Sequence, residues 1–416
     1  MKISAFQRGW IMAVLMLSGE SVFLLPFVLV RIFRPTFLVS FNLTNLELGT
    51  AFSVYGVVAT LSYFLGGPIA DRFSARKLLS SSLFLTAAGG LVLGLNPSLF
   101  ALTLLYAFWG ISSILLFWAA FIKAIRIYGG EAQMGRAYGW VDAGRGVVAA
   151  AMASASVALY DYLLPEQLGI FQSAPRVNAL IFVIYAFSFF TVIAGLLIWL
   201  IMPKDDHPKI ATSHVRPSFN WQDISRVSLN SKVWWQAIVV LCAYVAYKST
   251  DDISLYGTEV LQMDEVTAGH LASLTFWIRP IGALIAGYLG DRFGISRMCK
   301  LSFALVIMAC ISLSIPDLIS GSFVLIIMSI AIGSLGIYGL RGLYFALFKE
   351  NEVSLKHTGV AVGLISVIGY SPDVFFGPLM GWLLDHNPGQ TGHQHLFMMV
   401  AAFGIIGLFA SSKIKM

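Results

Sequence analysis

The sequence contains the stretch Gly67-Pro68-Ile69-Ala70-Asp71-Arg72-Phe73 and, 220 residues later, its near copy Gly287-Tyr288-Leu289-Gly290-Asp291-Arg292-Phe293. Each copy follows an apolar segment long enough to cross a lipid bilayer. The same offset aligns Gly49 with Gly269, so the similarity extends beyond the motif. The repeat therefore predicts a chain built from two duplicated halves, which is a known plan of membrane transporters.

The composition places this chain in a membrane. Of its 416 residues, 58% are hydrophobic and 12% charged, and the mean hydropathy is +0.80, whereas a soluble domain is nearer half apolar and a quarter charged. The net charge of +6 includes no basic block, so no nucleic-acid partner is expected. The three cysteines have no metal-ligand spacing, and we expect neither a metal nor another cofactor.

About twelve apolar segments have the length of a transmembrane helix. We place them at residues 8–32, 46–70, 77–96, 98–127, 134–160, 176–202, 233–260, 266–290, 297–316, 321–348, 357–384 and 394–412. The first run is longer than the apolar part of a signal peptide, so we expect it to be retained. The sequence predicts an all-α integral membrane protein with twelve transmembrane helices in two pseudo-symmetric six-helix bundles.

A polar segment, residues 203–232, separates the two halves, so we expect the chain to consist of three regions. These are an N-terminal bundle at 1–202, a cytoplasmic linker at 203–232 and a C-terminal bundle at 233–416. With the N-terminus inside, most Lys and Arg residues fall in cytoplasmic segments, and the outside receives only Arg34 and Arg176, with Arg31 at the outer end of the first span. This bias predicts that both termini are cytoplasmic.

The two motif copies, with the basic residues that follow them, resemble the loop signature of the major facilitator superfamily. The residues that carry the resemblance are Gly67, Asp71, Arg72 and Arg76 in the first copy and Gly287, Asp291, Arg292 and Arg297 in the second. The resemblance implies a loop that latches the bundles on the cytoplasmic side during alternating access. From the residues alone, Gly67 and Gly287 are expected to permit close helix approach, and a solvated charge cluster is the alternative.

Ten ionisable residues are predicted at membrane depth, where an unpaired charge is costly. The basic ones are Arg31, Arg145, Lys248, Arg279 and Arg341, and the acidic ones are Glu20, Asp142, Asp251, Asp252 and Asp373. Asp142 and Arg145 are three residues apart, and Lys248 precedes Asp251 and Asp252 by three and four, so each set shares a helix face. Structural ion pairing is one interpretation of these sets, and a functional site is the other.

We interpret the basic residues, with Tyr247, as candidates for solute binding. The five acidic residues are candidates for proton coupling, because one lysine does not neutralise both Asp251 and Asp252. The stretch Leu-Val-Arg-Ile-Phe at 29–33 also resembles the basic end of the first helix in organophosphate:phosphate antiporters. Those carriers have a second arginine in span seven, where this chain has Tyr247 and Lys248, so a phosphate substrate is in doubt.

The sequence thus favours a secondary transporter of a small polar, anionic organic solute, coupled to protons or a counter-solute, in a bacterial inner membrane. A proton-coupled multidrug or metabolite efflux antiporter and a solute sensor of transporter fold are the alternatives. We expect a monomer in the lipid bilayer and no enzymatic activity. Because no phosphate-binding Gly-x-x-x-x-Gly-Lys-Ser/Thr motif occurs, energy is expected from a gradient.

Overall fold

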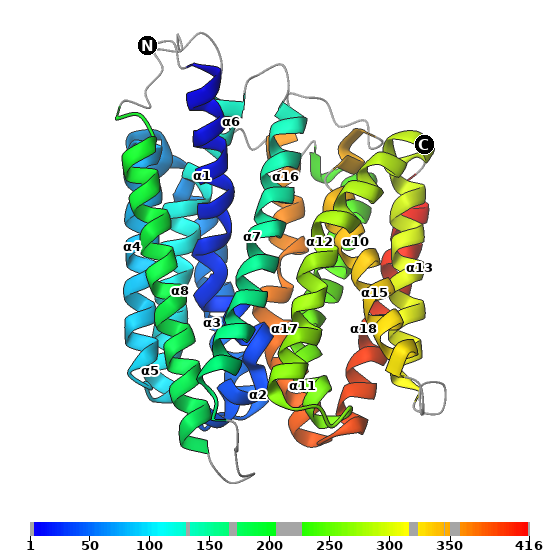
Figure 1. Cartoon of the computed structure of the whole chain (residues 1–416). Coiled ribbons are helices and arrows are strands. Elements are labelled where there is room, and N and C mark those ends of the chain that lie inside the picture. Colours follow the sequence, from blue (N-terminus) through cyan, green and yellow to red (C-terminus); the bar gives the residue numbers. More distant parts are fainter. Residues whose placement is uncertain are drawn as a thin grey trace. The chain divides into compact units, whose positions relative to one another are not determined.

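The computed structural model describes residues 4–129, 134–165, 173–204, 227–315, 323–344, 346–349 and 358–414, and all regular structure within them is helical (Figure 1). The first half comprises α1 (Ala5–Phe23), η1 (Leu24–Val28), α2 (Leu29–Phe41), α3 (Asn45–Arg72), α4 (Ala75–Gly94), α5 (Leu99–Gly110), η2 (Ile111–Trp118), α6 (Ala119–Gly129), α7 (Met134–Leu163) and α8 (Ser173–Ile201). The second half comprises α10 (Ser231–Lys248), η4 (Ser249–Asp252), α11 (Ile253–Glu259), α12 (Glu265–Phe293), α13 (Ile295–Ser314), α15 (Phe323–Leu343), η5 (Ala346–Lys349), α16 (Thr358–Gly369), α17 (Pro372–His386) and α18 (Gln390–Lys413).

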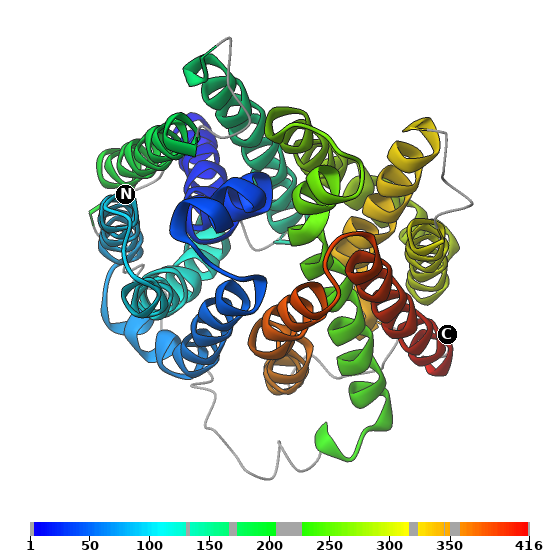
Figure 2. The ribbon, with the colours of Figure 1, turned by 90° about the horizontal axis from the view of Figure 1, so that it is seen from below.

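The helices form two compact units, and Figure 2 shows the helices of each unit roughly end-on. Unit 1 comprises Met1–Pro208 and Asp251–Trp277, and unit 2 comprises Lys209–Thr250 and Ile278–Met416. In unit 1, α4 packs on α8, α3 on α5, and α1 on α7 and α8. In unit 2, α13 packs on α15 and α18, and α10 packs on α16 and α18. The predicted boundaries at 203–232 stay a prediction, because residues 205–226 lie outside the described part of the chain.

The membrane-spanning character of the chain is confirmed. Among the described residues, eleven helices are long and apolar enough to cross a bilayer. The predicted span 233–260 is not among the eleven, because the 3₁₀ turn η4 divides it into α10 and α11. The number of twelve helices and the side on which the termini lie therefore stay predictions. The first span is longer than predicted, since α1, η1 and α2 follow one another from Ala5 to Phe41, with a kink at Phe33.

Small residues allow the helices of each unit to approach closely, as is common where lipid rather than water surrounds a bundle. A Cβ at Gly90 on α4 would stand 2.1 Å from Oγ of Ser188 on α8. In unit 2, a Cβ at Gly407 on α18 would stand 2.3 Å from Cζ of Phe303 on α13. Any larger residue at either position would require the facing side chains to move.

The two copies of the repeated motif lie where α3 and α12 end and α4 and α13 begin. The close approach expected at Gly67 and Gly287 is not made there, since no described atom lies within 4 Å of a Cβ built at either residue. The neighbouring Gly66 and Gly290 allow the close approach instead. A Cβ built at Gly66 would stand 3.3 Å from the Leu115 carbonyl oxygen, and one built at Gly290 would stand 2.8 Å from Cδ2 of Leu343.

The charged residues of the motif differ in exposure. Arg76 is buried, with its guanidinium 4.4 Å from the ring centroid of Trp199. The other five charged residues are exposed at the helix ends: Asp71, Arg72, Asp291, Arg292 and Arg297. The latching role that the resemblance implies for this motif stays a prediction.

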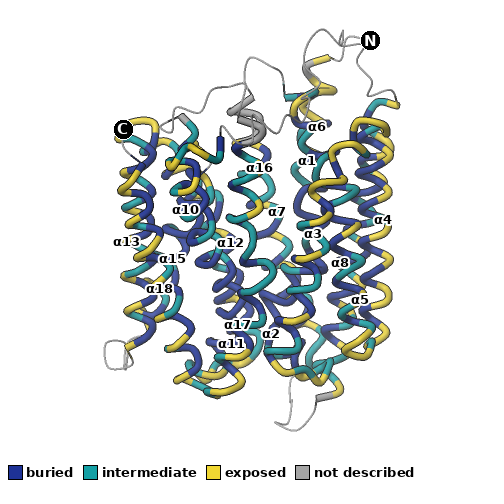
Figure 3. Tube along the Cα trace, turned by 180° about the vertical axis from the view of Figure 1, so that it is seen from behind, coloured by how far each residue is buried: buried dark blue, intermediate teal, exposed yellow. Residues whose placement is uncertain are grey.

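Large apolar side chains cover the outside of the helices. Exposed residues alternate with buried ones along α4 and α13 (Figure 3). The exposed set includes Leu91 on α4, Phe189 and Leu200 on α8, and Met308 on α13. Apolar patches of this extent are rare on soluble proteins and are the surface that lipid covers.

The start of α12 generates a first prediction. Asp264 caps this helix: Oδ1 accepts from the backbone N–H groups of Val266 and Thr267, both at 3.0 Å, and Oδ2 accepts from Oγ1 of Thr267 at 2.6 Å. Partial burial raises the pKa of Asp264, but these hydrogen bonds outweigh it and hold the pKa below its usual value. The carboxylate therefore stabilises the fold above the pKa it has when unfolded, and this contribution is lost as pH falls through the folded pKa.

Asp264→Ala is expected to lower the free energy of unfolding by about 0.5–2 kcal/mol, the usual effect of removing an N-cap. Asp264→Asn keeps an acceptor oxygen without a charge, so it is the matched control and should show little loss. Thermal unfolding in detergent at neutral and acidic pH measures both variants. Equal stability of Asp264→Ala and the unchanged chain at neutral pH would contradict the cap.

Candidate functional site

The first buried ion pair in unit 1 joins Arg31 on α2 to Asp251 in η4. Nε of Arg31 donates to Oδ1 of Asp251 at 2.7 Å, and Nη2 contacts the same oxygen. The side chains of both residues are only 3% exposed. Charges at this depth persist only when a partner compensates for the lost hydration, and each residue supplies that partner to the other.

The backbone around Arg31 is irregular. A π-helical turn, η1, containing Pro26 precedes α2, and Oη of Tyr106 donates to the Pro26 carbonyl at 3.1 Å. Oγ of Ser254 donates to the Arg31 carbonyl at 2.9 Å, and the guanidinium lies 5.4 Å from the ring centroid of Phe276. Arg31 is therefore not at the end of the first span, as predicted, but inside a longer helical run that continues to Phe41.

A second group of charges in unit 1 is organised by Arg145 on α7. Its Nη2 lies 3.3 Å from Oε2 of Glu20 and its Nη1 lies 3.5 Å from Oδ1 of Asp142, while Nε donates to the Gly19 carbonyl at 3.0 Å. The contact between Asp142 and Arg145 confirms the pairing expected from their spacing. The contact with Glu20 ties α7 to α1, and this partner was not predictable from spacing along one helix.

Gly19 makes this arrangement possible. A Cβ at Gly19 would stand 2.6 Å from Cζ of Phe121 and 2.9 Å from Cδ of Arg145. The guanidinium of Arg145 also lies within 6 Å of three ring centroids, those of Phe23, Trp118 and Phe121. Arg145 is thus enclosed by aromatic faces as well as by two carboxylates.

Arg34 is a buried cation that the sequence analysis placed in an outer segment, and that placement was wrong. Its side chain is fully buried in α2, and Nε and Nη2 donate to Oδ1 of Asn45 at 3.2 and 2.9 Å. The backbone is kinked at Phe33, between the two arginines, so helical spacing from Arg31 did not reveal the position of Arg34. The predicted end of the span at residue 32 concealed it.

In unit 2, Lys248 pairs with Asp373 of another helix. Nζ of Lys248, at the end of α10, lies 3.7 Å from Oδ1 of Asp373, at the start of α17. Oη of Tyr244 donates to the same carboxylate at 3.1 and 3.0 Å. The pairs of Lys248 with Asp251 and Asp252 that their spacing suggests stay a prediction.

Tyrosines surround this pair. Tyr244 lies edge-on to Tyr370, with ring centroids 5.0 Å apart, and Oη of Tyr370 lies 3.3 Å from Oη of Tyr344. The guanidinium of Arg341 on α15 lies 3.8 Å from the ring centroid of Tyr247. Tyr370 occupies the break between α16 and α17, so an irregular segment again coincides with charge. We call Lys248, Asp373, Tyr244, Tyr247, Tyr370 and Arg341 the polar cluster of unit 2.

The remaining predicted residues are also buried. Asp252 is fully buried in η4 of unit 1, and Arg279 is buried in α12 of unit 2, directly before Pro280. No group of three or more metal-ligating residues occurs in the described part of the chain.

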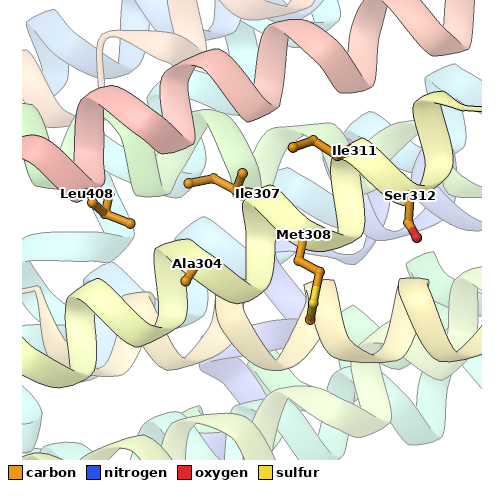
Figure 4. Close-up of a pocket in the computed structure, with 6 residues that line it drawn as sticks. All are labelled: Ala304, Ile307, Met308, Ile311, Ser312 and Leu408. Atoms are coloured by element: carbon orange, nitrogen blue, oxygen red, sulfur yellow. The ribbon is translucent and has the colours of Figure 1, made fainter.

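A hollow of about 560 Å³ lies beside α13 and α18 in unit 2 (Figure 4). Its lining is almost wholly apolar: Ala304, Ile307, Met308, Ile311, Ser312 and Leu408. Met308 and Ile311 are also exposed on the outside of α13. No charge lines this hollow, so it suits an acyl chain of the bilayer better than a polar solute.

Comparisons with known proteins agree with this architecture. A family model described as Major Facilitator Superfamily matches residues 9–377. Inner membrane protein YqcE of Escherichia coli K12 is 26% identical, with 98% of this chain and 95% of the relative covered. The probable galactarate/D-glucarate transporter GudP of the same strain is 25% identical over 44% of this chain and 41% of its own length.

Among solved structures, a bacterial homologue of the human lysosomal transporter Spinster, in an inward-facing and unoccupied conformation, gives a TM-score of 0.75. It is 16% identical, and the match covers 99% of this chain and 98% of that one. At this identity the match supports the fold alone.

The pair of Arg31 and Asp251 generates the second prediction. Arg31→Met should destabilise the protein by roughly 3–5 kcal/mol, because it leaves a buried carboxylate without its cation. The double variant with Asp251→Leu removes both charges and should recover much of that loss. The more exposed pair of Arg176 and Glu265, with 3.4 Å between Nη1 and Oε1, provides the control, since Arg176→Met should cost less than about 1 kcal/mol. Thermal unfolding in detergent ranks the variants, and a double variant no more stable than Arg31→Met would contradict a buried pair.

Proposed function

This chain belongs to the Major Facilitator Superfamily, and from that membership we propose that it is a secondary active transporter of a small anionic organic solute, coupled to protons. It is a multi-pass integral membrane protein, and its relative YqcE is named an inner membrane protein, which supports the same location for this chain. The superfamily fold supports transport by alternating access.

The charge balance at membrane depth carries the proposal of an anionic solute. The ten residues predicted at membrane depth, together with the buried Arg34, comprise six cations and five carboxylates. A surplus of positive charge in a medium of low dielectric constant favours an anion and repels a cation. The relative GudP, named as a probable transporter of galactarate and D-glucarate, supports the same class, since both of these compounds are dicarboxylates.

We propose that the charges divide by role. Arg31 and Arg145 of unit 1 contact Asp251, Glu20 and Asp142 through a direct hydrogen bond or at 3.3–3.5 Å, and we assign these residues to structure. In unit 2, Nζ of Lys248 lies 3.7 Å from Oδ1 of Asp373, beside half-buried tyrosines that offer hydroxyl groups. We propose that Lys248, with Arg279, Arg341 and Tyr247, binds the solute.

Asp373 is the carboxylate we propose for proton coupling. When ionised, it attracts the ammonium of Lys248 and accepts two hydrogen bonds from Tyr244. Protonation removes its negative charge and leaves the ammonium of Lys248 to the anionic group of a solute. The protein then binds the proton and the solute in the same state, as a symporter requires.

The third prediction concerns Lys248. Lys248→Ala should reduce solute uptake by at least about tenfold, because a charge-assisted contact to the solute, worth roughly 1.5–3 kcal/mol, is lost. Counterflow in proteoliposomes measures this with a panel of sugar acids, sugar phosphates, sulfonates and lipophilic cations. Lys232→Ala, at the polar end of the same helix, is the control and should transport normally. Uptake of lipophilic cations alone would replace the proposal with drug efflux.

The fourth prediction concerns Asp373. Asp373→Asn should make solute exchange independent of pH and abolish uptake driven by a proton gradient, because the side chain no longer binds or releases a proton. Asn retains the size of the side chain and one acceptor for Tyr244. Counterflow at two pH values, together with gradient-driven uptake, distinguishes coupling from binding. Proton-driven uptake that persists in Asp373→Asn would assign coupling to another residue.

A further inference from the structure

The polar cluster of unit 2 contains more hydroxyl groups than an anion alone requires. Tyr244 and Tyr247 on α10 and Tyr370 at the break before α17 are half-buried, in spans that are otherwise apolar. Phenylalanine would fill the same space without a polar atom, and a buried hydroxyl is unfavourable unless it is hydrogen-bonded. The hydroxyls of Tyr244 and Tyr370 have such partners in Asp373 and Tyr344.

These partners are of a kind that a solute can replace. The carboxylate of Asp373 and the phenol hydroxyls form hydrogen bonds similar to those made by the hydroxyl groups of a polyol. Tyrosine rings also offer flat faces that pack against the C–H groups of a carbon chain or sugar ring. A hydroxylated solute thus substitutes one set of hydrogen bonds for another, whereas an apolar solute forms no hydrogen bonds with these groups.

Arg341 adds a second anchoring group. Its guanidinium lies over the face of Tyr247 at 3.8 Å, and its N–H donors project in the guanidinium plane. That geometry is suited to two parallel hydrogen bonds with a planar carboxylate. Lys248 supplies a point charge for an anionic group. Contacts connect it to Arg341: Arg341 lies over the rings of Tyr244 and Tyr247, Tyr244 donates to Asp373, and Lys248 contacts Asp373.

We propose that the polar cluster of unit 2 recognises a polyhydroxylated carboxylate of sugar size, a sugar acid, with its carboxylate held by Arg341 or Lys248 and its hydroxyl groups held by Tyr244 and Tyr370. This inference rests on the proposed function and narrows its substrate class. A lipophilic cation would meet two positive charges at this cluster, and an inorganic anion would make no use of the tyrosines.

The test compares two solutes that differ only in their hydroxyl groups, D-glucarate and adipate, both six-carbon dicarboxylates. Binding to the purified full-length protein in detergent and counterflow in proteoliposomes are measured for each. The protein is expected to bind glucarate at least about tenfold more tightly than adipate, because only glucarate has hydroxyl groups that can form hydrogen bonds with the tyrosines and Asp373. Glucitol, which has the hydroxyl groups without a carboxylate, is expected to bind poorly.

Tyr370→Phe removes one hydroxyl and leaves the ring. It should weaken glucarate binding by roughly three- to tenfold and leave adipate binding unchanged, an effect that a merely structural role for Tyr370 would not produce. Tyr244→Phe provides a second variant if Tyr370→Phe does not fold, as judged by size-exclusion chromatography. For Tyr244→Phe the same difference between the two solutes is expected.

The outcomes separate this inference from the proposed function. Equal binding of glucarate and adipate, or an equal loss of both in Tyr370→Phe, would overturn the sugar-acid inference while leaving an anion transporter in place. Binding and uptake of neither dicarboxylate, with uptake of lipophilic cations, would overturn both.

Discussion

The low dielectric constant of the bilayer is the constraint on which this structure depends, because it forces each charge at depth to acquire a partner. Arg31 with Asp251, Arg145 with Glu20, and Lys248 with Asp373 each join two helical segments of the same unit. Packing alone holds helices together only weakly when lipid tails surround them. The ion pairs therefore strengthen the association of these helices and determine which helices face one another.

Irregular backbone occurs beside these charges. Arg31 follows the π-helical turn η1, Asp251 lies in the 3₁₀ turn η4, and Asp373 begins α17 directly after a break. Such segments free backbone carbonyls, which is tolerated in a membrane only where protein groups satisfy them. Tyr106 does so at Pro26, and Ser82 does so at Ser112 within η2, where its hydroxyl donates at 2.6 Å. The polar residues and the irregular turns are thus parts of one arrangement.

The sequence predicted the helical membrane fold because each span is a continuous apolar run, and hydropathy reports that directly. The predicted first span ended before Arg34 because a charged residue usually marks the end of a transmembrane helix. The hydrogen bonds of Arg34 to Asn45, which allow it to be buried, are not visible in the sequence. Asp251 pairs with Arg31, 220 residues away along the chain, and spacing within one helix does not reveal a partner at that distance. Only the short pair of Asp142 and Arg145 was within reach of that reasoning.

The two units solve the same electrostatic problem in different ways. In unit 1 the arginine pairs are buried and short, and opening them would expose a charge to the membrane interior at a cost of several kcal/mol. In unit 2 the lysine and the carboxylate are further apart and are bordered by half-buried tyrosines. A transport site must be satisfied both when empty and when occupied, since solute enters and leaves it in every cycle. In the proposed site, Asp373 and the tyrosines would meet that condition for a hydroxylated anion, because their mutual hydrogen bonds would be exchanged for bonds to the solute when it binds.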